Sequence, residues 1–188
     1  MYESIASRCV DGKLVCAENH HSSTDAQVSS SQLLSIFFAA PALACDTIAE
    51  IACGTDGFET LCAAVGAADL ADTLDDKDEH FTVFAPNDDA FGNLPDGTVE
   101  ALLDDIPALT NILLFHVVSG HVLEADDLHC TEKIEMANGD DSRTVCKGHD
   151  IFQKGAGNSR SKMPEIIATD IEACNGVIHV VSEVMLPP

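Results

Sequence analysis

From Thr47 onward, apolar residues recur at helical spacing. The periodic positions are Ile48, Ile51 and Ala52, then Phe58, Leu61, Cys62 and Val65. Because side chains three and four residues apart share a helix face, this spacing predicts two short amphipathic helices separated near Gly54.

A second helical region follows the turn Pro95-Asp96-Gly97. Thr98 is predicted to cap a helix, and Pro107 is predicted to be the first residue of another helix that runs through Phe115. The apolar face of the first of these helices comprises Val99, Leu102, Leu103 and Ile106.

Short runs rich in β-branched and apolar residues predict strands, and most of them lie beyond His116. The first run, Phe81 to Ala85, stops at Pro86, after which Asn87 or Asp88 is expected to cap a short helix. The other predicted strands are 117–123, 133–137, 143–147, 151–153, 166–169 and 177–182. Helices followed by strands predict an α+β fold.

The first 44 residues differ in composition from the rest of the chain. Residues 1–32 carry few large apolar side chains and are predicted to be disordered. Residues 33–44 form an apolar run ending in Ala42-Leu43-Ala44, which is typical of a secretory signal peptide and too short to span a bilayer as a helix. We therefore predict a leader over 1–44 and one folded domain over 45–188; a start site further downstream and a lipidated Cys45 remain open alternatives.

Three segments carry a resemblance to a known family. The run that begins at Phe81 and the run that begins at Asn175 resemble the two signature segments of the fasciclin domain. Between them, Leu113 to Val118 resembles the family's third mark, in which an aromatic residue and a histidine precede a strand. The signature residues are Phe81, Thr82, Val83, Phe84, Ala85, Pro86, Asn87, Asp89, Ala90 and Phe91, then Asn175, Gly176, Val177, Ile178, His179 and Val180.

The resemblance covers about 45–188 and implies helices packed on a compact β-sandwich or wedge of about seven short strands, with the 81–85 and 177–182 strands side by side in the core. It also associates Phe115 and His116 with adhesion, although phenylalanine stands where the family usually has tyrosine. From the residues themselves, His116 follows an apolar run and is expected to be a buried, hydrogen-bonded histidine. His179 alternates with apolar neighbours and is expected at a surface or sheet edge.

Eight cysteines without a C-x-x-C pair favour disulfides in an oxidising compartment over a zinc site. Cys130 and Cys146 bracket a hairpin-like stretch around Asn138-Gly139, so they are predicted to pair and to stabilise the fold by about 3 kcal/mol. A second bridge is predicted among Cys53, Cys62 and Cys174, with one of the three left free. The connectivity of this second bridge is not fixed by the sequence.

The chain has 9 basic and 32 acidic residues, a net charge of −23, which disfavours nucleic acid and anionic membranes. Most acidic pairs read as solvated surface, and no loop matches a tight calcium site, so only weak, diffuse calcium binding is expected. The segment 155–162 is interpreted as a mobile loop, the one place where its basic residues relieve the acidic surface.

No catalytic, phosphate-binding or dinucleotide motif is present, so we predict no enzyme activity and no cofactor. The leading hypothesis is a secreted or cell-surface adhesion or matrix protein that binds an extracellular partner, including a second copy of itself. The alternative is a carrier of a carotenoid-like or lipid-like apolar molecule, as some algal members of the family are. A third option, contact of the acidic surface with mineral or ice, rests on charge alone.

Overall fold

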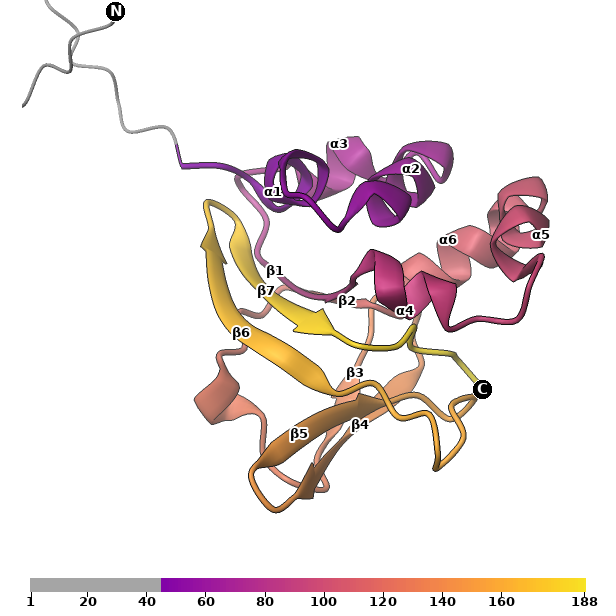
Figure 1. Cartoon of the computed structure of the whole chain (residues 1–188). Helices are drawn as coiled ribbons and strands as arrows, with labels where there is room; N and C mark the ends of the chain where they lie inside the picture. Colours follow the sequence, from indigo (N-terminus) through magenta and orange to yellow (C-terminus); the bar gives the residue numbers. More distant parts are fainter. Residues whose placement is uncertain (1–44) are drawn as a thin grey trace, which may run out of the picture. The chain divides into compact units, whose positions relative to one another are not determined.

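The computed structural model describes residues 45–188, and the predicted leader, with Cys9, Cys16 and the pair His20-His21, lies outside the described residues. The helices come mainly first along the chain and the strands mainly later, as the predicted α+β class requires (Figure 1). The helices are α1 (Ile48–Gly54), α2 (Glu59–Ala67), α3 (Ala71–Leu74), α4 (Asp88–Gly92), α5 (Thr98–Asp104) and α6 (Ile106–Leu114), with the 3-10 turn η1 (Ala125–Asp127).

Local capping chemistry explains where several helices begin. Thr47 and Glu50 form a reciprocal capping box at the start of α1. The Asn87 side chain accepts a hydrogen bond from the Ala90 amide and starts α4, as predicted. Thr98 is the first residue of α5 and does not cap it, because Gly97, with φ at 79°, occupies the cap position.

The strands are β1 (Phe81–Pro86), β2 (Val117–Ser119), β3 (Lys133–Glu135), β4 (Asp141–Lys147), β5 (Asp150–Lys154), β6 (Ile166–Ala173) and β7 (Gly176–Val181). They form a four-stranded sheet in the order β2-β1-β7-β6 and a three-stranded sheet in the order β3-β4-β5. The predicted sandwich or wedge of about seven strands on which helices pack is therefore confirmed.

The two signature segments are neighbours, as the resemblance implied. β1 and β7 pair in parallel with Phe81 opposite Gly176 and Pro86 opposite Val181. At Gly176 a Cβ atom would collide with the Phe81 carbonyl, so only glycine permits this approach of the two backbones. Pairing across this distance in sequence places both segments at the centre of the fold.

Side chains alternate between the two faces of the four-stranded sheet, and both faces are buried at its central strands β1 and β7. One face carries Phe81, Val83 and Ala85 and packs in a core cluster with α1, α2, α3, α4 and α6. The opposite face carries Phe84, which packs with Phe115 and with residues of the loops around the three-stranded sheet. Figure 1 shows the same arrangement, with α1 to α3 on one side of β1 and β7 and β3 to β5 on the other.

Two strands differ from their predicted lengths by four residues, more than the others do. The predicted strand 117–123 ends at Ser119, because the backbone then turns at Gly120 and the Thr82 hydroxyl bonds both the His121 carbonyl and the Leu123 amide. The predicted strand 166–169 continues to Ala173 and pairs with β7 through two register shifts. Its polar residues interrupt the apolar pattern, so the sequence did not predict the second half of the strand.

Candidate functional site

Phe115 and His116 directly follow α6 and lie inside the protein. Phe115 is fully buried, and His116 is 2% exposed. The His116 ring uses both nitrogens: Nδ1 donates to the Ile112 carbonyl at 2.8 Å, and Nε2 accepts from the Met185 amide at 2.8 Å. Because an accepting nitrogen carries no proton, this arrangement requires the neutral imidazole, and burial accordingly lowers the pKa of His116 to about 4.

These contacts agree with the interpretation of His116 as a satisfied core histidine that joins a helix end to another segment. They leave neither side chain a surface for direct contact with a partner. The adhesion role expected from the resemblance therefore finds no support in the exposure of Phe115 or His116, and in this structure both act by holding α6 and the C-terminal segment together.

The expectation for His179 was wrong, because this side chain is fully buried. Alternation does direct it away from the helices, but the other face of β7 is covered as well. Its ring lies 5.5 Å from that of Phe84, and Nε2 donates to the Leu123 carbonyl at 2.8 Å. Burial lowers the pKa of His179, against the opposing effects of that hydrogen bond and of Asp170.

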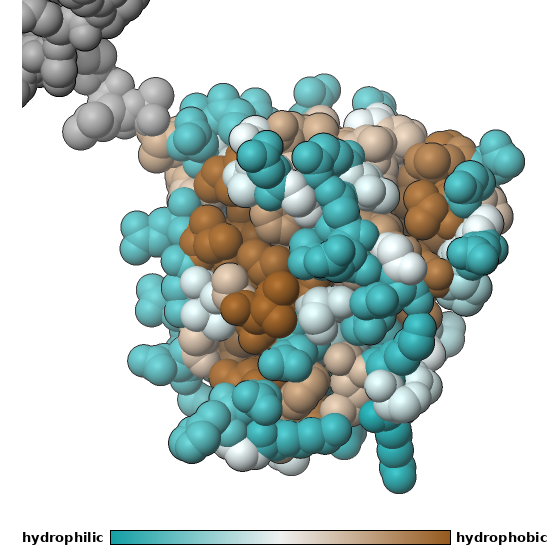
Figure 2. All heavy atoms as spheres, viewed as in Figure 1, coloured by the Kyte–Doolittle hydropathy of each residue, from teal (hydrophilic) through white to brown (hydrophobic). Residues whose placement is uncertain are grey.

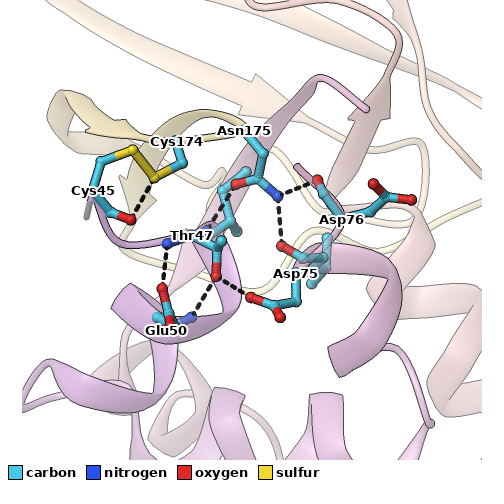
Figure 3. Close-up of a disulfide and its surroundings, with 9 residues drawn as sticks. Cys45, Thr47, Glu50, Asp75, Asp76, Cys174 and Asn175 are labelled. Atoms are coloured by element: carbon cyan, nitrogen blue, oxygen red, sulfur yellow. Dashed lines mark hydrogen bonds between the residues drawn. A yellow bond between two sulfur atoms is a disulfide. The ribbon is translucent and has the colours of Figure 1, made fainter. Parts of the chain in front are cut away.

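Asn175, in the turn between β6 and β7, is a second buried connection point (Figure 3). Its side-chain oxygen accepts from the Ile48 amide at 3.0 Å, and its nitrogen donates to the carbonyls of Leu74 and Asp76 at 2.7 and 2.9 Å. Next to it the Cys45–Cys174 disulfide joins the start of the described chain to the end of β6. One side chain thus fixes α1, α3 and the turn before β7.

The described cysteines form three disulfides, Cys45–Cys174, Cys53–Cys62 and Cys130–Cys146. The predicted Cys130–Cys146 pair is confirmed. The second bridge predicted among Cys53, Cys62 and Cys174 is the Cys53–Cys62 disulfide. The prediction that the third of these cysteines stays free was wrong, because Cys174 pairs with Cys45, for which the sequence predicted only a cleavage or lipidation site.

Most other signature residues also build the interior. The whole of β1 is buried, as are Ala90, Phe91 and the β7 residues from Val177 to Val181, whereas Asp89 is exposed. Within residues 45–188, no buried side-chain nitrogen or oxygen lacks a hydrogen-bond partner. The family marks therefore describe how the domain is held together, and a binding surface has to be sought elsewhere.

A row of basic side chains on the three-stranded sheet was not predicted from the sequence. Lys133 on β3 lies opposite Arg143 on β4, which lies opposite Lys154 on β5. Cross-strand partners point to the same face, so the three cations stand side by side. They line a hollow of about 360 Å³ with Asp141, Ser142, Gly155 and Ala156. The signal available in the sequence was that Arg143 and Lys147 are four residues apart in one predicted strand and therefore share a face.

The 155–162 loop is attached more firmly than expected. Asn158 is buried, its oxygen accepts from the amides of Gly155 and Leu186, and its nitrogen donates to the Val184 carbonyl at 2.8 Å. The expectation that this loop is the one place where the acidic surface is relieved was also wrong, because the basic row on β3 to β5 is a second such place.

An apolar cavity of about 120 Å³ lies between the helices and the four-stranded sheet. Side chains of α1, α2, β1 and the end of α6 line it, among them Ala52, Phe58, Leu61, Val83 and Leu113. Well-packed protein interiors rarely leave an apolar space of this size.

The rest of the described surface was compared with three other kinds of site: apolar patches, metal sites and membrane-spanning helices. Hydrophilic side chains cover much of the face in Figure 2, and apolar side chains gather near α5 and along β6, where Leu103, Ile106 and Ile167 are exposed. Among residues 45–188 there is no group of three or more His, Cys, Asp or Glu placed to hold a metal ion. No described helix is long and apolar enough to cross a membrane.

These features define a class: a disulfide-linked α+β domain whose helices pack on one side of two sheets joined by a shared core. The sequence matches the fasciclin domain over residues 56–187, and the chain belongs to the fasciclin domain family. The recognition drawn from the three sequence marks is confirmed.

Relatives occur in bacteria and animals. Two proteins of Synechocystis sp., sll1483 and the uncharacterized protein sll1735, are 41% and 40% identical to this chain; the alignments cover 76% and 74% of it and 74% and 96% of those proteins. Transforming growth factor-beta-induced protein ig-h3 of Sus scrofa is 31% identical over 76% of this chain, which spans 19% of that protein.

A solved structure of a FAS1 domain pair from the insect cell adhesion molecule fasciclin I has a similar fold. The TM-score is 0.64 at 17% identity, over 75% of this chain and 51% of that one. At this identity the likeness supports the fold alone.

Proposed function

We propose that this chain is a non-enzymatic extracellular adhesion or matrix protein that binds a macromolecular partner through its fasciclin domain. The observation that carries the proposal is that a fasciclin domain is combined with a complete set of disulfides: every cysteine from Cys45 onward is paired. Stable disulfides require an oxidising compartment, which supports export. The apolar run at 33–44, outside the described residues, supports the same localisation.

The distribution of side chains supports binding in place of catalysis. The two buried histidines are hydrogen-bonded to backbone groups of the core, and neither ring is exposed to solvent. Charged side chains lie on the surface, where they are available to a partner whose contact depends on charge. Weak calcium binding to the acidic surface belongs to this proposal as a modulating influence.

Adhesion of coated beads tests the proposal. Oxidised full-length chain is coated on beads, which are then mixed with one another and with extracellular material from the source cells, with and without millimolar calcium. We expect aggregation of the beads or capture of that material. The control is the same chain with its disulfides reduced and blocked, which removes the fold. Adhesion no greater than that of the control at every calcium concentration would contradict the proposal.

The apolar cavity favours a second candidate function, transport of a small apolar molecule. A cavity of about 120 Å³ is close in size to an engineered cavity of about 150 Å³ that binds benzene. A polyene as long as a carotenoid is far larger than this cavity. As a carrier, the protein would therefore hold a ligand with a single ring, or the end of an acyl chain.

Benzene binding followed by NMR tests the carrier function. Ala52 lines the cavity, and Ala52→Leu fills part of it, whereas Ala67→Leu adds the same atoms to the exposed side of α2. We expect shifts at the methyl groups of Leu61, Val83 and Leu113 in the parent chain and in Ala67→Leu, and their loss in Ala52→Leu. Absence of shifts in the parent chain would rule out the cavity as a ligand site.

A further inference from the structure

We propose that the outer face of the three-stranded sheet, centred on Lys133, Arg143 and Lys154, binds the acidic segment 72–79 of a second copy of this chain. The inference rests on the proposed adhesion function and names its partner and surface. It predicts that the protein binds itself head to tail.

The basic row is unusual within an acidic chain. The described part of the chain holds seven lysines and arginines, and four of them, the three of the row and Lys147, lie on this face. Neighbouring strands are about 4.8 Å apart, so the row presents three cations at regular short spacing. The hollow of about 360 Å³ beside them gives a partner group room to enter between the side chains.

Few carboxylates neutralise these cations. Among residues 45–188 the single ion pair joins Lys133 to Asp141 at 2.8 Å, so Arg143 and Lys154 have no carboxylate within 4.0 Å. Lys147 lies over the Phe152 ring, 5.1 Å from its centre. The acidic groups of the same face, Glu135, Asp141 and Asp150, sit at the strand ends, at the edges of the basic row.

The acidic segment has the opposite character. Asp72, Asp75, Asp76, Asp78 and Glu79 fall within eight residues that include one cation, Lys77, and all of these side chains are exposed. The Asp75 carboxylate accepts from Thr47 and the Asp76 carboxylate accepts from the Asp78 amide. The carboxylates of Asp72, Asp78 and Glu79 have no such internal partners among the described residues and are available to a neighbour.

The two surfaces lie on different sides of the domain, so they cannot satisfy each other within one chain. Figure 1 shows α3 and the loop to β1 on the side of the helices and β3 to β5 on the far side of the four-stranded sheet. Contact between unlike surfaces of identical chains is heterologous, and it continues from copy to copy unless the rotation closes a ring. This geometry suits homophilic adhesion, in which each copy offers one surface of each kind.

The net charge of −23 restricts the size of an anion that can bind to the basic row. At physiological salt the charges act over about 8 Å, so a short acidic loop feels mainly the basic row. A long polyanion, such as a sulfated polysaccharide, extends beyond the row and meets the acidic remainder of the surface. Charge complementarity therefore favours the compact acidic segment of a second copy.

Sedimentation velocity of two charge-reversed variants, alone and mixed, tests the inference. Arg143→Glu/Lys154→Glu destroys the basic row, and Asp78→Lys/Glu79→Lys destroys the acidic segment. At about 0.15 M salt, we expect the parent chain to form larger species as its concentration rises and each variant to associate at least about tenfold more weakly. An equimolar mixture should associate again, because the first variant keeps its acidic segment and the second keeps its basic row.

General attraction does not explain such a rescue, because both variants remain strongly net negative. Arg160→Glu/Lys162→Glu is the matched control, since it makes the same charge change in the 155–162 loop, away from the basic row, and should leave association unaltered. A parent chain that stays monomeric, or a mixture that does not associate, overturns the inference. So does binding of heparin through Arg143 and Lys154 without self-association. If beads still capture cell-surface material in these cases, the proposed function stands and only its homophilic form fails.

Discussion

The two sheets of this domain share a core and differ in what covers them. The four-stranded sheet has helices on one face and loops and the smaller sheet on the other, and its central strands β1 and β7 are buried almost throughout. The three-stranded sheet buries Ser142, Thr144 and Gln153 on its inner face and leaves its cations on the outer face. The comparison teaches that the segments by which the family is recognised build the interior, while the basic row, which we propose as the contact surface, lies on strands without a family mark.

The largest effect should come from separating the helical layer from the four-stranded sheet. The Cys45–Cys174 disulfide spans 129 residues, whereas Cys130–Cys146 spans 16 and braces only the smaller sheet. Loop entropy predicts a loss of about 5 kcal/mol in the free energy of unfolding for Cys45→Ala/Cys174→Ala and about 3 kcal/mol for Cys130→Ala/Cys146→Ala. Urea unfolding of both variants measures the difference, and equal losses would contradict the distinction between the two regions.

Truncation of one aromatic residue in each sheet measures how much packing in that sheet contributes to stability. Phe84 in β1 is fully buried, while Phe152 in β5 is only partly buried beneath Lys147. Phe84→Ala should cost about 4 kcal/mol because it leaves a cavity that the close-packed core cannot fill. Phe152→Ala should cost less than about 2 kcal/mol, since less apolar area is lost. Thermal and urea unfolding of the two variants test this order.

A pH titration examines the histidine that holds the core together. The folded-state pKa of His116 is about 4, below the ordinary value of 6.5, so the unfolded chain binds a proton first. The contribution of His116 to the free energy of unfolding should therefore be fully present above about pH 6.5. This contribution should fall by about 3 kcal/mol as the pH drops toward 4.

The control for this titration separates His116 from the many carboxylates. His116→Gln should lose a large part of the slope between pH 6.5 and 4, with His179 supplying part of what remains. His121→Gln makes the same substitution at an exposed ring and is measured beside it as the matched variant. An unchanged slope in His116→Gln would show that this side chain is not the buried neutral group described above.

The sequence predicted the interior better than the surface, for a physical reason. Helical spacing from Ile48 to Val65, the compact run at Phe81 and the turn at Asn175-Gly176 are local signals, and the core obeys them. The burial of His179 depends on what lies across the sheet, and the pairing of Cys45 with Cys174 depends on the closure of almost the entire domain. The basic row forms only when β3, β4 and β5 pair in register. The single cations between Lys133 and Lys154 therefore did not predict it.

The smallest effect on stability should come from the outer face of the smaller sheet. Arg143→Glu/Lys154→Glu removes exposed or half-exposed charges without internal partners, and it should change the free energy of unfolding by less than about 1 kcal/mol. Urea unfolding measures this change. A loss comparable to that of Phe84→Ala would mean that the row is a structural element, in contradiction to its assignment as a contact surface.

Lysine acetylation of the parent chain tests the central claim, that partner contact lies on the outer face of β3 to β5 and not at the family marks. The chain is labelled briefly at low and at high concentration, and modification is read at each lysine by mass spectrometry. We predict that Lys133 and Lys154 become protected at high concentration together with Lys77 in the acidic segment, while Lys162 is modified equally under both conditions. Equal labelling of Lys133, Lys154 and Lys162 at all concentrations would contradict the account.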